Sequence, residues 1–373
     1  MNRKNNGYVA GIDIGAGSGA KVGIFSKETM PVAEGLLPIE RYGNDPEITA
    51  KGLALTVRNL LNQTGGCSSD IVAAGVAMPG FSCSDGTIRC NNLPFLNGVH
   101  FSDILRKHMK VPVFTFNDAD AGGMAEWSKA KVELLYWVLG GGWGGAWISA
   151  DGRVQYPTVD WDGDDDKLHF SNEPGSAIPL KKTWLAKQME SLGGSYELFE
   201  KVCLRERNWP GNRITGPNGR DDCVRAELIV SGNGRWRLFM TFAEKFQDYK
   251  DILNDEEKEK VMLSSVAGSI LDKLAEAGTE VMKRTDALFA IAIAEAAEMH
   301  FKGGDRGNCP DGIPIYVGGK PSRAFKFFAP RAHEIMAKKK LKSRMQVSWF
   351  ASHNLNANLC GAAVLAWRNF REI

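Results

Sequence analysis

The stretch GIDIGAGSGAKVGIF, residues 11–25, has an apolar run on each side of a glycine-rich turn. A second stretch of the same design, LGGGWGGAWI at residues 139–148, lies further along the chain. A glycine turn between two strands offers bare backbone N–H groups to an anion, because no side chain obstructs the approach. An ordinary β-hairpin also ends in glycine, and the chain has 41 glycines. The argument for a phosphate site therefore rests on the order and spacing of several motifs.

An acidic motif lies between the two glycine turns. The sequence FNDADAGGMAEW, residues 116–127, places Asp118 at the end of an apolar run and at the start of a helix pattern. Two phosphate-sized turns and one carboxylate indicate a phosphoryl-transfer site shared by two halves of the chain. An aspartate in this place is also a good helix N-cap, which is the alternative interpretation.

The composition narrows the class of protein. A length of 373 residues predicts about two domains, and 43% hydrophobic with 24% charged residues is typical of a soluble globular chain. With a net charge of +2, the chain has no broad positive electrostatic field that would attract nucleic acid or an anionic membrane. No apolar run approaches the roughly 20 residues needed to span a bilayer, and the basic N-terminus lacks the apolar core of a signal peptide. We therefore expect a cytoplasmic protein with no nucleic-acid or membrane partner.

The seven cysteines are scattered and form no CxxC pair. Reduced thiols in the cytoplasm fit this pattern best. None of the six histidines lies close to a cysteine with metal-ligand spacing.

The first half of the chain alternates strand and helix patterns, which predicts an α/β domain with a mixed central sheet. Asp45 and Pro46 form a start signal for one of the helices. The second half opens with another hairpin and continues mainly with helices. The expected strands are 8–14, 21–25, 31–38, 71–78, 111–116, 133–139, 146–148 and 313–317, and the expected helices are 48–61, 102–108, two long ones within 256–299, and 357–371.

Several motifs in sequence order resemble one known family. After the first glycine turn come AAGVAMPG (73–80), NNLPF (91–95), VPVFTFNDADAGGMAEW (111–127) and the second glycine turn. NEPGSAIP, IPIYVGGKPS and GAAVLAW follow at 172–179, 313–322 and 361–367. This order resembles the ROK (repressor/ORF/kinase) family of sugar kinases, within the actin-like ATPase group. The resemblance spans essentially the whole chain and is most specific between residues 73 and 148.

The resemblance implies a fold and a function. The fold would be α/β, with two actin-like (ribonuclease H-like) lobes, mixed central sheets and a cleft between the lobes. The small lobe would comprise residues 1–117 plus 355–373, and the large lobe residues 118–354 with an insertion around 183–250. The function would be that of an ATP-dependent, glucokinase-like kinase for a hexose or hexose derivative, using ATP and Mg²⁺. A homodimer is expected.

The resemblance also gives roles to the acceptor residues. A sugar hydroxyl is a poor nucleophile, so Asp118 would accept its proton as general base. Asn92 and Asn117 carry amides that both donate and accept, as a polyol requires. Asn92 could instead cap a loop. Glu173 would accept from two sugar hydroxyls, or it could be an exposed loop carboxylate, and Ser176 stands where the family has a sugar-binding histidine.

The nucleotide would be held by the glycine turns. Asp13 would organise the Mg²⁺–phosphate region through water, or it could bond the backbone of its own turn. Gly318 and Gly319 would let the backbone approach the nucleotide, or could simply end a strand. The full expected set is Asp13, Gly15, Gly17, Ser18, Gly19, Lys21, Gly140, Gly141, Gly142, Gly144, Gly318 and Gly319.

The chain departs from the family in four places. The first turn is about one residue longer than the usual DIGGTxxK, and Gly141 replaces a threonine that commonly touches phosphate. Ser176 replaces the histidine, and the CxCGxxGC zinc element is absent, so zinc is not expected and glucose specificity is open. The acidic run at 160–166 fails as a calcium loop, because Ser171 occupies the place of the bidentate glutamate.

Two other functions remain open at this point. One is a catalytically impaired, sugar-sensing regulator of the same fold. The first strand is expected to begin by Tyr8, which leaves no room for the N-terminal helix-turn-helix of the family's repressors. The other is a kinase for a non-glucose acceptor, which would keep the ATP turns and change the residues around Asn92 and Glu173.

Overall fold

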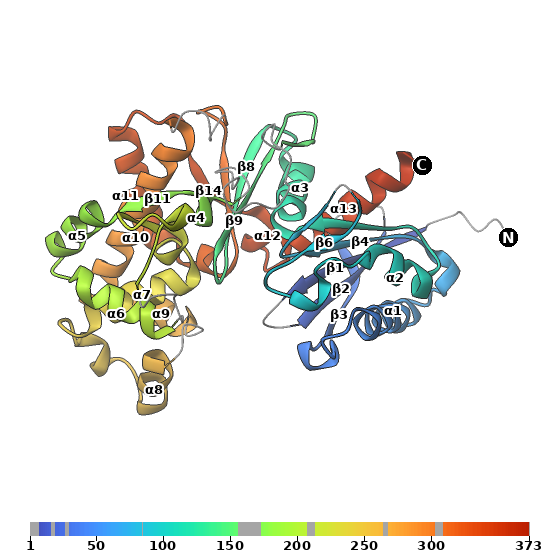
Figure 1. The fold of residues 1–373 in the computed structure, drawn as a ribbon, viewed down its shortest axis with the longest axis horizontal. Helices are drawn as coiled ribbons and strands as arrows, with labels where there is room; N and C mark the ends of the chain where they lie inside the picture. Colours follow the sequence, from blue (N-terminus) through green and yellow to red (C-terminus); the bar gives the residue numbers. More distant parts are fainter. Residues whose placement is uncertain are drawn as a thin grey trace.

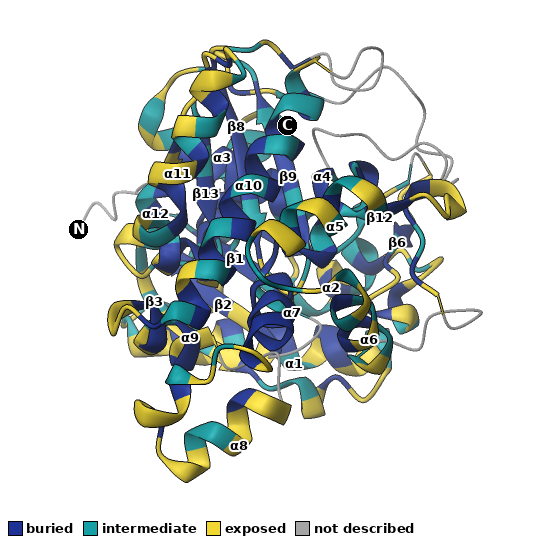
Figure 2. Ribbon diagram, turned by 90° about the vertical axis from the view of Figure 1, so that its left-hand side faces the viewer, coloured by how far each residue is buried: buried dark blue, intermediate teal, exposed yellow. Residues whose placement is uncertain are grey.

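The fold is organised by two five-stranded mixed sheets, seen side by side in Figure 1. The computed structural model describes residues 7–15, 19–26, 30–83, 85–155, 173–206, 213–263, 268–302 and 309–372. The acidic run at 160–166 lies outside these residues, as do Gly17 and Ser18. Figure 2 shows that the strands of both sheets are mostly buried and that exposed residues lie on the surrounding helices and loops.

The first sheet has the strand order β3-β2-β1-β4-β7. Its first three strands are antiparallel, whereas β1, β4 and β7 run parallel. Helices α1 and α2 pack together beside it, and the side chain of Asp45 caps α1 by accepting from the N–H of Ile48. The elements are β1 (Tyr8–Gly15), β2 (Gly19–Phe25), β3 (Pro31–Leu37), α1 (Pro46–Gln63), β4 (Ile71–Met78), α2 (Phe101–Met109) and β7 (Val113–Asn117).

The second sheet repeats this design, with the order β10-β9-β8-β13-β14. An antiparallel hairpin, β8–β9, opens it, and β8, β13 and β14 run parallel. The predicted α/β fold with two mixed sheets is thereby confirmed. The strands are β8 (Leu134–Leu139), β9 (Trp143–Ile148), β10 (Val154–Gln155), β13 (Ile315–Gly318) and β14 (Met345–Val347).

Two helices lie between the sheets. Helix α3 (Asp118–Ala130) packs on β8 and β9, and α13 (Ala357–Glu372) packs on β1 and β4. The two helices also pack against each other at very short range, because a Cβ added to Gly361 would lie 1.6 Å from the carbonyl oxygen of Ala121. The chain therefore crosses from one sheet to the other at the start of α3 and again before α13.

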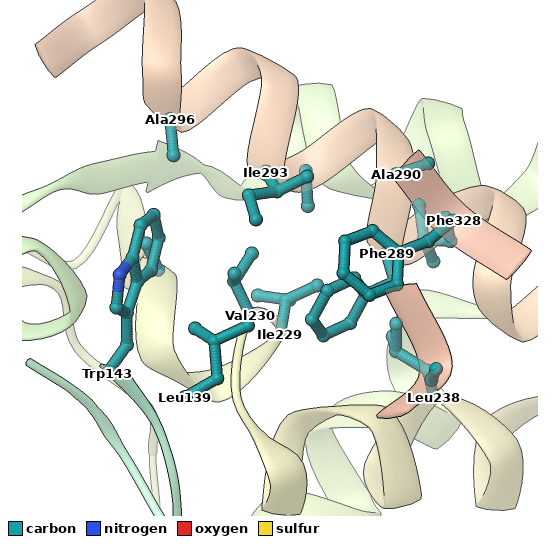
Figure 3. Packing of buried hydrophobic residues seen from close by; sticks show 14 of the residues in the cluster. Leu139, Trp143, Ile229, Val230, Leu238, Phe289, Ala290, Ile293, Ala296 and Phe328 are labelled. Atoms are coloured by element: carbon teal, nitrogen blue, oxygen red, sulfur yellow. The ribbon is translucent and has the colours of Figure 1, made fainter. Parts of the chain in front are cut away.

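The second sheet is covered by a mainly helical region with its own core. In this core Leu139 and Trp143 pack with Val230 and with Ile293 of α10, as Figure 3 shows. The second glycine turn is thus held between two anchored side chains. The elements of this region are α4 (Pro174–Ala177), β11 (Pro179–Lys181), α5 (Lys182–Ser191), α6 (Tyr196–Glu206), β12 (Cys223–Arg225), α7 (Gly232–Ala243), α8 (Asp255–Leu263), α9 (Gly268–Glu276), α10 (Glu280–Lys302), α11 (Phe325–Lys338) and α12 (Trp349–Ser352).

Two long helices were expected within 256–299, and the helical chain there is divided at Gly278, with α8 and α9 before it and α10 after it. Residues 264–267, between α8 and α9, lie outside the described residues. Gly278 has a positive φ of 68°, a conformation that ends α9. The carboxylate of Asp248 then accepts from the backbone N–H groups of Glu280 and Val281 and so caps α10. The helix patterns on the two sides of this break read as one in the sequence. Among the described residues, no helix combines the length and apolar character that a membrane span requires.

Candidate active site

The start of α3 places Asn117 and Asp118 at the end of the parallel strand β7. Asn117 is the N-cap: its Oδ1 accepts from the N–H groups of Ala119 (2.9 Å) and Asp120 (3.2 Å). Its Nδ2 donates to the carbonyl oxygen of Gly80 at 3.0 Å. The capping role considered for Asp118 therefore belongs to Asn117. With its oxygen engaged twice, Asn117 can offer a sugar only its remaining amide proton.

Asp118 is half-buried and lies in an acidic environment. Burial raises the pKa of its carboxyl group to about 7, and the negative charges of Asp13 and Asp120 add to the shift. The N–H of Ala119, which donates to Asp118 at 2.9 Å, opposes it. A carboxylate whose pKa lies near neutrality is well matched to accepting a proton from a hydroxyl.

Asp13 lies near the end of β1 and directly opposite Lys21 of β2. The Nδ2 of Asn356, in the segment before α13, donates to Asp13 Oδ2 at 2.6 Å. Burial raises the pKa of Asp13, while Asn356 and Lys21 counteract this effect. The turn between the strands is fixed at Gly19, whose φ is +93° and whose added Cβ would lie 2.2 Å from the carbonyl oxygen of Leu37.

Glu173 immediately precedes α4, which packs against β9 and against residues 226–228. A Cβ added to Gly175 would lie 2.6 Å from the carbonyl oxygen of Trp143 and 2.8 Å from the Cβ of Glu227. Burial raises the pKa of Glu173 to about 8, and Asp118, Glu227 and Asp120 contribute further. The structure thus brings Glu173 and Asp118 together.

The same end of β9 also touches α3. A Cβ added to Gly144 would lie 3.4 Å from the Cβ of Ala119, the residue after Asp118. Since Trp143 touches α4 and Gly144 touches α3, the two carboxylates approach from the two sides of the first residues of β9. Ser176 lies in the same turn of α4 as Gly175 and is half-buried.

Asn92 is exposed in the loop between the first sheet and α2. The backbone N–H groups of Asn92 and Leu93 are directed at the buried thiol of Cys90, which donates to the carbonyl oxygen of Pro79 at 2.9 Å. Burial raises the pKa of the Cys90 thiol, and the charge of Asp118 adds to this shift. The loop carrying Asn92 therefore lies near Asp118.

The second glycine turn leaves its backbone open. Gly140 and Gly141 are exposed, and a Cβ added to Gly140 would meet no atom within 4 Å. The N–H of Gly232, in the first turn of α7, donates to the carbonyl oxygen of Gly140 at 2.8 Å. The N-terminus of α7 and the partial positive charge it carries therefore lie beside this turn, which favours an anion there.

Gly318 and Gly319 lie against the strand that enters this turn. Gly319 has a φ of +83°, and an added Cβ would lie 1.9 Å from the carbonyl oxygen of Leu139. An added Cβ at Gly318 would lie 2.2 Å from the hydroxyl oxygen of Tyr136. The end of β13 is thus joined to the strand that enters the second glycine turn. Gly142 is also constrained, because its added Cβ would lie 2.7 Å from Glu227 Oε2.

Sequence reasoning missed three residues of this site. Asp120 stands inside the recognised motif, so its spacing from Asp118 was a signal that could have been used. Glu227 and Asn356 carry no local signal, since each reaches the site by contacts far along the chain. Within the described part of the chain, no three His, Cys, Asp or Glu side chains form a group that could hold a metal ion.

Comparisons with known proteins show what the chain is similar to. Residues 9–156 match the ROK family, and no curated protein matches the sequence. A ROK family glucokinase from Streptomyces griseus, in complex with glucose and AMPPNP, is 17% identical with a TM-score of 0.66, over 97% of this chain and 100% of that chain. A ROK hexokinase from Thermus thermophilus is 19% identical with a TM-score of 0.62, over 98% and 100%.

The fold is also that of a regulator. A ROK family transcriptional regulator, described as a homolog of the E. coli MLC protein, is 13% identical with a TM-score of 0.62, over 98% of this chain and 79% of that chain. At these identities the structural likeness shows the fold. Together with the sequence match, it confirms the predicted resemblance: residues 9–156 match the ROK family, and the chain as a whole has the fold of ROK sugar kinases.

Proposed function

We propose that the protein is an ATP-dependent kinase that phosphorylates a hydroxyl group of a hexose or hexose derivative, with Asp118 as general base. The observation that carries the proposal is the Asp118 carboxyl group, whose pKa of about 7 suits a base and which lies close enough to Glu173 and Asp13 for their charges to act on one another. The glucokinase of the same fold was solved with glucose and AMPPNP, which supports the same pair of ligands here.

The acceptor would lie between Asn92, on the loop beside the first sheet, and Glu173, at the start of α4. Ser176 would contribute a hydroxyl group, and Asn117 its remaining amide proton. Glu227 extends this set, because it lies against α4 and its charge acts on Glu173. A polyol would thus meet carboxylates that accept from its hydroxyl groups.

Mg²⁺-ATP would lie along the glycine turns, with Gly15 and Gly19 in the first, Gly140, Gly141, Gly142 and Gly144 in the second, and Gly318 and Gly319 near the nucleoside. Gly17 and Ser18 belong to this set on sequence alone. The carboxylate of Asp13 would hold the Mg²⁺ ion through water molecules, because it lies near the first turn and opposite Lys21. The ion would neutralise charge on the phosphates.

In the reaction, the acceptor oxygen forms a bond to the γ-phosphorus while the bond from that phosphorus to the β-phosphate oxygen breaks and releases ADP. The hydroxyl proton passes to Asp118, which then returns it to solvent. The carboxylate must be ionised at the start, so the reaction depends on the fraction of Asp118 that has lost its proton. We also propose a small lobe of residues 1–117 plus 355–373 and a large lobe of residues 118–354. The protein would be a cytoplasmic homodimer, and the proposed reaction does not use zinc.

The second candidate function is a sugar-responsive regulator without turnover. It is favoured by the similar fold of the ROK transcriptional regulator and by the changes at Gly141 and Ser176. An ADP-release assay over hexoses, amino sugars and polyols separates the two. Turnover that requires Asp118 supports the kinase. If the wild type binds sugar but releases no ADP, with or without Mg²⁺, the kinase proposal is contradicted and the regulator is favoured.

A further inference from the structure

We propose that the acceptor carries a positively charged amine, so that the preferred substrate is an amino sugar with a free ammonium group rather than a neutral hexose. This inference rests on the proposed kinase function and specifies its substrate class. It follows from the distribution of charge across the site, in which the acceptor side and the nucleotide side differ.

The acceptor side is a group of carboxylates. Glu173 and Glu227 belong to segments that touch at Gly175, where the added Cβ would lie 2.8 Å from the Cβ of Glu227. Asp118 and Asp120 start α3, which meets the same end of β9 through Ala119. Trp143, which begins β9, is fixed in the core shown in Figure 3, so this end of the strand is a rigid support for both segments.

The neighbouring charges that raise the pKa values of Glu173 and Asp118 are negative. For Glu173 these charges are on Asp118, Glu227 and Asp120. For Asp118 they are on Asp13 and Asp120. On the nucleotide side, in contrast, Lys21 lies opposite Asp13 and the N-terminus of α7 lies beside Gly140. Lys21 and the N-terminus of α7 thus lie on the nucleotide side, whereas Glu173, Asp118 and Asp120 lie on the acceptor side.

The basic side chains of α7 are engaged elsewhere. The guanidinium group of Arg235 is buried against Asp286 (2.8 Å) and Asp272 (2.6 Å). Arg237, which is fully buried, donates to Glu206 at 2.5 Å and to the carbonyl oxygen of Leu228. Both cations are thus matched with their own carboxylates. A ligand could therefore supply the positive charge that balances the carboxylates of Glu173 and Asp118.

An ammonium group suits this environment in two ways. It offers three hydrogen-bond donors and no acceptor, whereas a hydroxyl group offers one donor. It also carries a full positive charge into a site where carboxylates are partly desolvated, so that its attraction to them is stronger than in water. A nearby cation favours the ionised form of a carboxyl group, so binding of the amine should release protons from Glu173 and Asp118.

The test compares sugars that differ in charge. Glucosamine, mannosamine, galactosamine and 3-amino-3-deoxyglucose are each compared at pH 7 with the corresponding neutral N-acetyl sugar and the parent hexose. We expect at least one free amine to have a kcat/KM at least tenfold above both of its neutral counterparts. Titration calorimetry in two buffers of different ionisation enthalpy should show proton release when that amine binds and little when the parent hexose binds.

A matched pair of variants tests the cause. Glu173→Gln should reduce the preference for the amine by tenfold or more and leave the KM for ATP unchanged, whereas Glu190→Gln, on the exposed face of α5, should change neither. Turnover of neutral sugars without a preference for any amine would overturn this inference and leave the kinase intact. An undiminished preference in folded Glu173→Gln would also overturn it. Absence of turnover with every sugar would overturn the kinase and this inference together.

Discussion

At the scale of single residues, Asn117 and Asp118 have different roles at the start of α3. Asn117 uses its side chain to cap the helix and to hold the carbonyl oxygen of Gly80, which fixes the direction of the helix. Asp118 then projects from the first helical position into the acidic site. The capping therefore falls to Asn117, and the carboxylate of Asp118 is left for the site.

Replacement of Asp118 by asparagine removes the proton acceptor and keeps the shape of the side chain. We expect kcat to fall by about a hundredfold or more, since a general base contributes roughly 10²–10⁴-fold. Binding of sugar and ATP should remain largely intact, as measured by calorimetry. Asp103→Asn, which changes a half-exposed side chain of α2, serves as the control and should keep wild-type turnover. A near wild-type kcat in Asp118→Asn would remove the base role and favour the regulator.

The pH dependence of turnover follows from the raised pKa of Asp118. Below a pH of about 7 the carboxyl group is protonated and cannot accept the proton of the hydroxyl group. The value of kcat/KM should therefore rise with pH through about 7 and fall tenfold for each pH unit below it. Glu173, with a pKa of about 8, interacts with Asp118, so the rise belongs to the pair. A flat profile between pH 5 and 8 would contradict this assignment.

Gly141 is a position where the missing threonine can be restored. The φ of Gly141 is not positive, and its added Cβ would meet only Asn233 Nδ2, at 3.6 Å. Gly141→Thr should therefore fold normally and add one hydroxyl contact to phosphate. One such hydrogen bond is worth about 1 kcal/mol, so the KM for ATP should fall about fivefold. Gly319→Ala is the matched contrast, since its Cβ would clash with Leu139, and it should weaken ATP binding or folding.

The residues that the sequence could identify are those in linear motifs. Asp118 follows an apolar run and Glu173 stands in the NEPGSAIP motif, and the structure places them near each other. Glu227 and Asn356 join the same site only because β12 and the segment before α13 return to it. Their contribution depends on the three-dimensional course of the chain, which residue spacing does not contain.

At the scale of elements, apolar periodicity predicted most strands and helices of the first sheet, and their bounds differ from the expected ones by few residues. It failed where a distant side chain decides the boundary. The start of α10 is one example, because Asp248 caps it from 32 residues away. The start of α12 is another, because its cap comes from α3.

Glu126 of α3 is fully buried and caps α12 across the molecule. Its carboxylate accepts from the hydroxyl group of Ser348 and from the N–H groups of Trp349 (3.1 Å) and Phe350 (3.4 Å). Glu126→Gln replaces one acceptor oxygen by a donor that faces N–H groups. We expect the free energy of unfolding to fall by about 2 kcal/mol or more, measured by denaturant titration. Glu190→Gln, exposed on α5, should change it little, and an equal effect of both variants would exclude the capping role.

At the scale of the whole molecule, the two sheets are joined through α3 and α13, as Figure 1 shows. Arg368 of α13 links the parts further: it donates to the carbonyl oxygen of Gly152 and lies 5.5 Å from the ring centroid of Trp127. These contacts keep the two helices together. We therefore expect movement of one sheet relative to the other to be concentrated where the chain crosses, at Asn117 and before Ala357.

Sugar should therefore promote closure of the two lobes about these crossings. Asn92 lies on the side of the first sheet and Glu173 on the side of the second, so a sugar that contacts both gains contacts in the closed state. Small-angle scattering with saturating sugar, nucleotide, or both should show a smaller radius of gyration than the free protein. Glu173→Ala should lose this response to sugar and keep the response to nucleotide. Crystal structures with an unchanged angle between the lobes, at full sugar occupancy, would contradict closure, and normal sugar binding by Glu173→Ala would exclude Glu173 as the contact that drives it.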